Sequence, residues 1–293
     1  MKIRGLHTAI VTPFTNSGEL DLPAFERIID MQVDAGVDGI VVCGSTGEGA
    51  TLTTDEKQTL WRTAVERVAG RITVTAGTGT NDTRSTVDLS VKARQCGVDA
   101  VLVVTPYYNK PTSTGLVAHF RAIADATDVP MIIYNVPGRT GQNVSAETQL
   151  AVAEACPSVV ATKEASANLE QMCQIMRHAR GGFTLLAGDD VLTLPAIACG
   201  AGGVIAVISN YAPKRFGRLV RAALEGDVLT ARAEQMALMP FFTANFIESN
   251  PIPVKHIMHV LGHIQCEYRL PLTKASNATQ EALGSIMQDF VDA

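Results

Sequence analysis

The chain has 293 residues, of which 46% are hydrophobic and 18% are charged, and its net charge is -5 at pH 7. This composition excludes a disordered chain, and the negative charge without any Lys/Arg run excludes a general attraction to nucleic acid or acidic membranes. No apolar stretch reaches the roughly 18 to 20 residues of a membrane helix, and residues 1–7 are too polar for a signal peptide. We therefore expect a cytoplasmic protein with neither membrane nor nucleic-acid partners.

Short apolar segments alternate with longer amphipathic ones at a spacing of roughly 25 to 30 residues, which is typical of repeated βα units. The predicted strands are residues 8–11, 39–42, 72–76, 100–104, 131–135, 159–163, 184–187 and 204–207. Eight apolar strands, each followed by a helix, predict a closed parallel (β/α)8 TIM barrel, an α/β fold with both faces of the sheet covered.

The alternative fold is an open doubly wound sheet, whose first turn carries a Gly-x-Gly-x-x-Gly fingerprint. The first predicted strand leads into Thr-Pro-Phe at 12–14 instead, and Gly77 and Gly79 match only two of the three glycines. These observations favour the barrel.

Helix start signals occur at Thr54, Asn81 and Ser145. From about Gly226 the strand pattern stops and helical patterns follow, at residues 231–246, 253–262 and 279–293. We predict a catalytic barrel over residues 1–225 and a C-terminal helical region over residues 226–293.

Lys163 closes the apolar run 159–163. Lysine is seldom buried without a partner, and burial lowers the pKa of an ammonium because the charged form loses solvation. A lysine that is neutral near pH 7 is a nucleophile toward carbonyl carbon, as Schiff-base chemistry requires. The alternative is a lysine that reaches toward solvent and pairs with Glu164, and this run alone leaves both interpretations open.

Polar groups follow the second and fifth predicted strands, at the edge where barrel enzymes place their catalytic groups. Ser45 and Thr46 offer two hydroxyls within a glycine-rich turn that could bind a small carboxylate, or simply cap a helix. Tyr134 can relay protons to a carbonyl oxygen, and Arg139, in the loop that follows, can bind a carboxylate with two hydrogen bonds. Taken singly, Tyr134 could equally pack in the core and Arg139 could be a surface charge.

Three histidines, His256, His259 and His263, fall on one helical face at spacings of three and four residues. They could be metal ligands, but the His-Glu-x-x-His pattern is missing and no acidic residue has matching spacing. We therefore predict neither a metal nor an organic cofactor.

Several motifs together resemble those of the pyruvate-dependent class I aldolase and lyase family, along nearly the whole chain. These motifs lie at residues 12–14, 44–48, 105–108, 134–137, 163–166, 188–190 and 250–255.

The resemblance implies that Lys163 attacks the keto carbon of pyruvate and forms an imine, then an enamine that adds to an aldehyde. It is strongest to the branch that uses L-aspartate 4-semialdehyde in diaminopimelate and lysine biosynthesis, and it implies a homotetramer built as a dimer of dimers. The catalytic residues that it implies are Lys163, Tyr134, Ser45 and Tyr108, the last reaching in from a neighbouring subunit. The implied substrate-binding residues are Thr46, Arg139, Gly188 and Ile205.

Two alternatives to this function stay open. The Ser45-Thr46 pair is the arrangement common in sugar-acid lyases such as N-acetylneuraminate lyase, whereas Arg139 favours a second carboxylate. A catalytically silent barrel that binds a small molecule is the other alternative, which the presence of Lys163 and Tyr134 disfavours. The resemblance also implies weak or absent inhibition by lysine, because Lys57 and Ser85 replace the histidine and glutamate of sensitive relatives.

Overall fold

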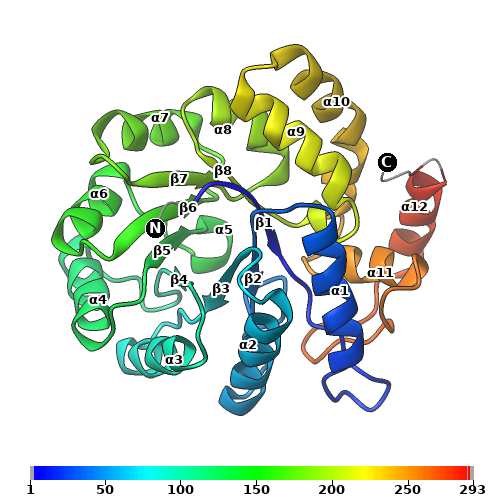
Figure 1. Ribbon diagram of the computed structural model, residues 1–293, viewed down its shortest axis with the longest axis horizontal. Coiled ribbons are helices and arrows are strands. Elements are labelled where there is room, and N and C mark those ends of the chain that lie inside the picture. The colour runs from blue at the N-terminus through cyan, green and yellow to red at the C-terminus, as the bar shows by residue number, and fades with distance from the viewer. Residues whose placement is uncertain (1–2, 289, 291–293) are drawn as a thin grey trace.

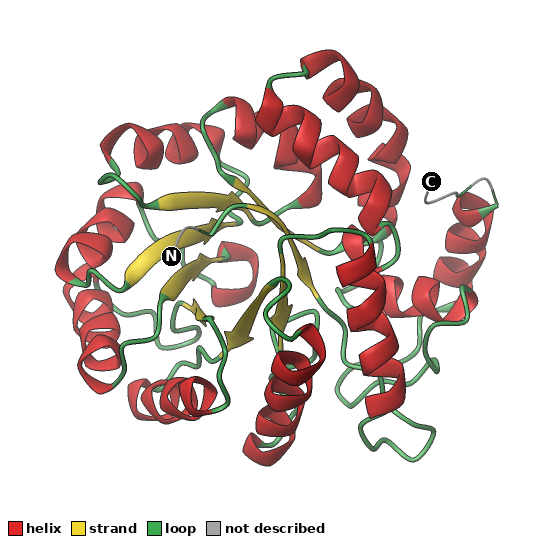
Figure 2. Cartoon of the chain, viewed as in Figure 1, coloured by secondary structure: helices red, strands yellow, loops and turns green. Residues whose placement is uncertain are grey.

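The computed structural model describes residues 3–288 and 290. Eight parallel strands form a closed barrel in which each strand pairs with the next and β8 returns to β1, and the helices surround it (Figures 1 and 2). The predicted fold class is confirmed. The strands are β1 Gly5–Ala9, β2 Gly39–Val42, β3 Thr73–Gly77, β4 Ala100–Val104, β5 Met131–Asn135, β6 Val159–Glu164, β7 Thr184–Ala187 and β8 Gly203–Ala206.

The α-helices follow the strands and continue past the last of them. They are α1 Leu22–Asp34, α2 Thr54–Val68, α3 Thr83–Gln95, α4 Ser113–Ala126, α5 Pro137–Thr140, α6 Ala146–Ala155, α7 Leu169–His178, α8 Thr193–Ala198, α9 Pro213–Glu225, α10 Val228–Ala244, α11 Ile252–Val260 and α12 Asn277–Met287. Two 3-10 turns, η1 Asp190–Leu192 and η2 Ile208–Asn210, follow β7 and β8. Within the described part of the chain, no helix combines the length and apolar character needed to cross a membrane.

Alternate residues of each strand belong to two separate apolar clusters. Ile132, Ala161 and Ile205 belong to the cluster inside the barrel, whereas Ile133 and Val159 pack outward against the helices. Because side chains of a strand alternate between its two faces, this assignment also fixes which polar residues face the barrel interior.

Some predicted boundaries are wrong. Strand β1 begins three residues before the predicted position, because Gly5 already pairs with Gly203. Helix α2 is capped by Thr53 and α3 by Asp82, each one residue from the predicted start, whereas Ser145 caps α6 as predicted.

Two more differences concern helices. Residues 137–140, predicted as a loop, form the short helix α5, which Pro137 begins. Helix α12 ends at Met287, and the rest of the predicted segment 279–293 includes positions 289 and 291–293, which lie outside the described residues.

The C-terminal helices lie against one side of the barrel. Helix α10 packs along α9 and also contacts α12, which in turn packs against α11. Gly226 ends α9 in the left-handed conformation, with φ 84°, which glycine adopts without strain. We propose this residue as the boundary between the barrel, 1–225, and the C-terminal helical region, 226–293.

Candidate active site

Lys163 lies near the carboxyl end of β6 with its side chain inside the barrel, and only 5% of the residue is exposed. It shares the inward face of β6 with Ala161. Among the described residues no carboxylate forms an ion pair with Lys163, so the interpretation that pairs it with Glu164 is wrong. Neighbouring residues of a strand point to opposite faces, and the two side chains are therefore on different sides of the sheet.

Glu164 faces outward and is completely buried. Its carboxylate accepts hydrogen bonds from the amide side chains of Asn135, Gln149 and Gln171, at 2.6 to 3.1 Å, and from the backbone N–H of Ser166 at 2.9 Å. Several donors to one buried carboxylate offset the loss of its hydration. This network holds the end of β6 against β5, α6 and α7, and so fixes the strand that carries Lys163.

Tyr134 lies on β5, in register with Lys163 on the adjacent strand. The lysine Nζ is 4.4 Å from the centre of the Tyr134 ring. The nucleophile predicted from the sequence therefore has a phenol beside it, as acid-base chemistry at an imine requires.

The turn after β2 presents Ser45 and Thr46. Both residues line the cavity around Lys163, and Thr46 is 3% exposed. The Thr46 hydroxyl accepts a hydrogen bond from Asn250 Nδ2 at 2.9 Å, so a segment more than 200 residues away in sequence holds this turn.

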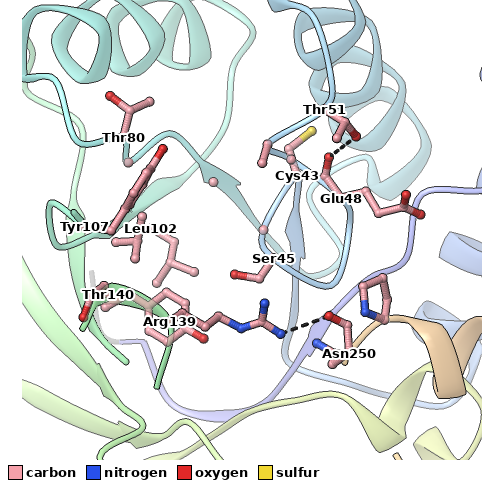
Figure 3. A pocket seen from close by; sticks show the side chains of 18 of the residues that line it. Cys43, Ser45, Glu48, Thr51, Thr80, Leu102, Tyr107, Arg139, Thr140 and Asn250 are labelled. Atoms are coloured by element: carbon pink, nitrogen blue, oxygen red, sulfur yellow. Dashed lines mark hydrogen bonds between the residues drawn. The ribbon is translucent and has the colours of Figure 1, made fainter. Parts of the chain in front are cut away.

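Arg139 on α5 donates a hydrogen bond from Nη2 to the backbone carbonyl of Asn250, at 3.0 Å. Figure 3 shows Arg139, Ser45 and Asn250 around one cavity. Arg139 is exposed and lines the cavity, and among the described residues its guanidinium forms this one hydrogen bond, so its other donors are available to a ligand.

Two connected cavities make up the site. The smaller, about 70 Å³, contains Lys163 and is lined also by Gly188. The wider, about 430 Å³, opens outward past Tyr107. Ser45, Tyr134 and Arg139 line both, so the two form one funnel that narrows toward the lysine.

Gly188 follows β7 at the narrow end of this funnel. A side chain there would place its Cβ 2.4 Å from the Cβ of Ala165, so the close approach requires glycine. Ile205, by contrast, is fully buried on β8 and does not line either cavity.

Tyr108 does not reach the site within its own chain. It is 89% exposed and has φ 71°, a conformation that is uncommon for a residue with a side chain. The side chain thus lies at the surface of this subunit, outside both cavities.

The sequence analysis assigned no role to Asn250 or Asp189, although both line the smaller cavity. Asp189 could have been found, because it lies two residues after the end of β7, where barrel enzymes place functional groups. Asn250 begins the 250–255 motif of the family resemblance, but it follows no strand, so the strand pattern does not place it at the site.

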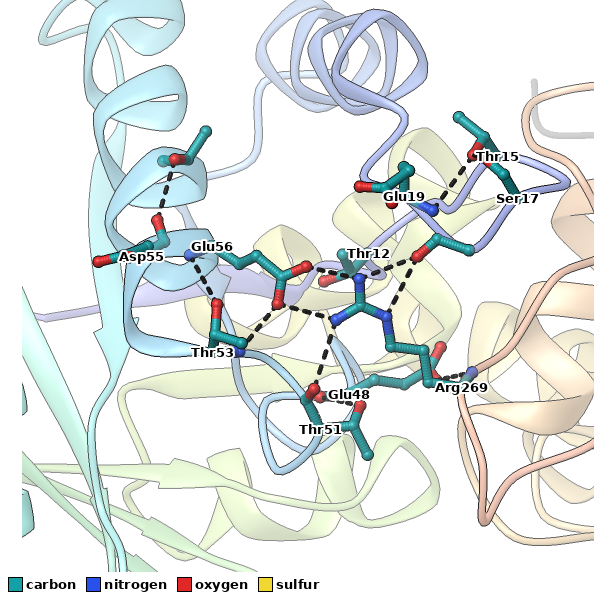
Figure 4. Close-up of polar contacts among 12 residues, drawn as sticks. Thr12, Thr15, Ser17, Glu19, Glu48, Thr51, Thr53, Asp55, Glu56 and Arg269 are labelled. Atoms are coloured by element: carbon teal, nitrogen blue, oxygen red, sulfur yellow. Dashed lines mark hydrogen bonds and ion pairs between the residues drawn. The ribbon is translucent and has the colours of Figure 1, made fainter.

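An ionic network holds Glu48, which ends the 44–48 turn, and Figure 4 shows its members Glu48, Glu56 and Arg269. Glu48 pairs with the fully buried Lys255 at 2.5 Å and accepts a hydrogen bond from the backbone N–H of Arg269 at 3.0 Å. The guanidinium of Arg269 in turn binds both carboxylate oxygens of Glu56. The C-terminal region thus fixes the turn that follows β2.

His256, His259 and His263, which the sequence analysis considered as metal ligands, do not form a metal-binding group in the structure. Across residues 3–288 and 290, no three His, Cys, Asp or Glu side chains gather as metal ligands would. The Nδ1 of His259 bonds the backbone carbonyl of Ile264 at 3.0 Å, which is a structural contact.

A closed parallel barrel with a buried lysine, unpaired with any carboxylate, in a cavity at the carboxyl ends of its strands is the architecture expected of lysine-dependent aldolases and lyases. The model of the dihydrodipicolinate synthetase family matches residues 2–290, and the chain belongs to this family. The predicted family, and with it the assignment to an enzyme of the lyase class, is thereby confirmed.

Individual relatives agree. The chain is 44% identical to the 4-hydroxy-tetrahydrodipicolinate synthase of Aquifex aeolicus over 98% of its own length and 97% of that protein's. The crystal structure of dihydrodipicolinate synthase from the same organism matches with a TM-score of 0.96, over 98% of this chain and 97% of that one. A dihydrodipicolinate synthase from Acinetobacter baumannii, solved in complex with pyruvate, is 36% identical and matches with a TM-score of 0.96 over 98% of both chains.

Proposed function

We propose that the chain condenses pyruvate with L-aspartate 4-semialdehyde, the reaction of a 4-hydroxy-tetrahydrodipicolinate synthase. The observation that carries this proposal is Lys163, which is buried, unpaired with any carboxylate, and 4.4 Å from the Tyr134 ring at the narrow end of a funnel. The relatives of that name cover nearly the whole chain, and Arg139 provides a carboxylate site for the second substrate. A sugar-acid lyase is the less favoured alternative.

In the first step the amine of Lys163 adds to the keto carbon of pyruvate, and loss of water gives the imine. Water loss requires proton transfer to the leaving oxygen, which we assign to Tyr134 and Ser45. The hydroxyl of Thr46 and the backbone around Ser45 are proposed to bind the pyruvate carboxylate, with Gly188 contributing main-chain groups in the same cavity. Ile205 lines neither cavity, so we propose no contact between it and pyruvate.

In the second step a proton leaves the methyl group of the imine, and the resulting enamine adds to the aldehyde carbon. The imine nitrogen accepts the electron pair during this proton loss, so the proposal requires no metal or organic cofactor. Arg139 would hold the semialdehyde carboxylate and place its aldehyde over the enamine carbon.

Tyr108 is proposed to complete the proton relay of a neighbouring subunit. Its 89% exposure and its position outside both cavities of its own chain support a contact across an interface. We accordingly propose a homotetramer, a dimer of dimers, acting in the cytoplasm.

The test is pyruvate consumption by the purified protein with L-aspartate semialdehyde, beside N-acetylmannosamine and glyceraldehyde. We expect fast turnover with the semialdehyde alone. Because Arg139→Ala removes a bidentate carboxylate contact, kcat/KM for the semialdehyde should fall on the order of 100-fold, while imine formation with pyruvate persists.

Arg139→Lys is the matched control. It keeps the charge but loses the forked geometry, so its kcat/KM should fall between those of the wild type and Arg139→Ala. Turnover with the sugar aldehydes alone would contradict the proposed substrate and support the lyase alternative.

A further inference from the structure

Two consecutive aspartates follow β7, and they have different surroundings. Asp190 is 1% exposed, and its carboxylate accepts the backbone N–H groups of Val207, at 2.9 Å, and Ile208, at 2.7 Å. Asp190 therefore joins the end of β7 to the turn after β8, and its role is structural.

Asp189 is half-buried and lines the smaller cavity with Lys163. Among the described residues, no group donates a hydrogen bond to its carboxylate or forms an ion pair with it. It is also the only acidic side chain among the described residues that line this cavity. A carboxylate in such a place, with an open face and no partner, is available to a cationic group of a ligand.

The electrostatic surroundings fit that role. Burial raises the pKa of Asp189, while the positive charge of Lys163 opposes the rise and the negative charge of Glu164 adds to it. A carboxylate with a raised pKa is a better base near neutral pH than an exposed one.

The second substrate proposed above carries a carboxylate, an aldehyde and an α-ammonium. Arg139 suits the carboxylate, and the aldehyde must face the enamine carbon on Lys163. The ammonium must also come close to that carbon, because ring closure requires its nitrogen to replace the lysine nitrogen. Before it can act as a nucleophile, it must lose a proton.

We propose, resting on the function proposed above, that Asp189 is a catalytic base that binds the α-ammonium of the semialdehyde and removes its proton for ring closure. The freed amine forms a bond to the former keto carbon of the Lys163 imine, and the bond between that carbon and the lysine nitrogen breaks. The added nitrogen then carries two hydrogens and a positive charge, and it passes one proton to the lysine nitrogen as its electron pair forms the ring C=N bond. The step frees the lysine amine, leaves the first proton on Asp189 and ends with a ring iminium, so protons and charge balance without an additional reactant.

Asp189→Asn keeps the size of the side chain and removes its charge and basicity. Trapping with borohydride and pyruvate should still add mass to Lys163, and exchange of the pyruvate methyl protons with deuterated water should stay within about two-fold, because neither step involves the semialdehyde. With the semialdehyde, kcat should fall roughly 100-fold to 10,000-fold, as for loss of an acid-base group, and KM should rise.

Succinate semialdehyde, which lacks the amine, provides the specific control. Its inhibition constant against condensation should be equal in the wild type and in Asp189→Asn, while the KM of the amine-bearing substrate differs.

Three results would overturn the inference: unchanged condensation kinetics in Asp189→Asn, loss of imine trapping to the same extent as condensation, or a parallel rise in the succinate semialdehyde inhibition constant. Failure of the proposed function is distinct from these, because the wild type itself would then form the imine without consuming the semialdehyde.

Discussion

Two lysines are buried in the part of the chain that the structure describes, and their surroundings differ. Lys255 on α11 has no exposed surface, pairs with Glu48 at 2.5 Å, and has its Nζ 4.5 Å and 4.8 Å from the ring centres of Phe14 and Tyr268. Lys163 on β6 forms no ion pair within the described chain, and a phenol and an open cavity lie beside it.

This difference separates a structural charge from a reactive one. Burial lowers the pKa of Lys255, and the carboxylate of Glu48 opposes that change, so the pair remains available as an ionic contact. Lys163 has no such partner, and its amine faces the space where a carbonyl compound fits. Both lysines are buried, and the reactive one differs in that no carboxylate among the described residues forms an ion pair with it.

The largest effect should come from Lys163→Met, which keeps an apolar chain of similar length and removes the nucleophile. Turnover should fall by on the order of 10,000-fold, equivalent to roughly 5.5 kcal/mol of barrier, while the fold is retained. Steady-state rates and the mass of the borohydride-trapped peptide measure the loss. Retention of one per cent of the activity would refute the role of Lys163.

The next effect is on stability. Lys255→Met leaves the Glu48 carboxylate buried without its cation, which should destabilise the fold by about 3 to 5 kcal/mol and lower Tm by roughly 6 to 20 °C. Thermal unfolding measures the shift.

The double variant Glu48→Gln/Lys255→Met is its matched control. Glutamine keeps an acceptor for the Arg269 N–H and removes the unpaired charge, so most of the lost Tm should return. Equal Tm values for the single and double variants would show that packing, not charge, explains the loss.

His119 on α4 extends the comparison of the two lysines to a buried base whose hydrogen-bond partner, the Thr83 hydroxyl, is uncharged. Its Nδ1 lies 2.9 Å from the Thr83 hydroxyl, its Nε2 has no partner, and burial lowers its pKa to about 4. The unfolded chain binds a proton below pH 6.5, whereas the folded one resists it until about pH 4. Stability is therefore lost as pH falls through this window, by up to about 3 kcal/mol.

His119→Gln should remove this dependence, since glutamine does not titrate. Tm measured between pH 7 and pH 4 should fall less steeply in the variant than in the wild type. Parallel curves would show that His119 contributes nothing to acid sensitivity.

Much of the fold could be predicted from the sequence because each strand of a parallel barrel is apolar on both faces. Such runs are easy to recognise, and their alternation with helices fixes the topology. The start of β1 and the helix α5 were not recovered. Strand β1 begins to pair at Gly5, which has no side chain to mark it as apolar. Helix α5 has four residues, which is too short for a periodic apolar pattern.

Some residues of the candidate site could be predicted from the sequence, and others could not. Ser45, Tyr134, Lys163 and Gly188 lie at or just after the ends of strands, and the closed sheet brings these ends together, so their meeting followed from chain order. The contact of Asn250 with Thr46 spans 204 residues and depends on how the C-terminal region docks. No local pattern specifies such a contact.

The support of the Ser45-Thr46 turn also sets an order of events during synthesis. Glu48 receives its contact from Arg269, 221 residues later in the chain. At roughly 5 to 20 residues per second, a ribosome needs on the order of 10 to 45 s to make that stretch. The hydroxyl turn that begins the active site is therefore among the first parts translated and among the last to be secured.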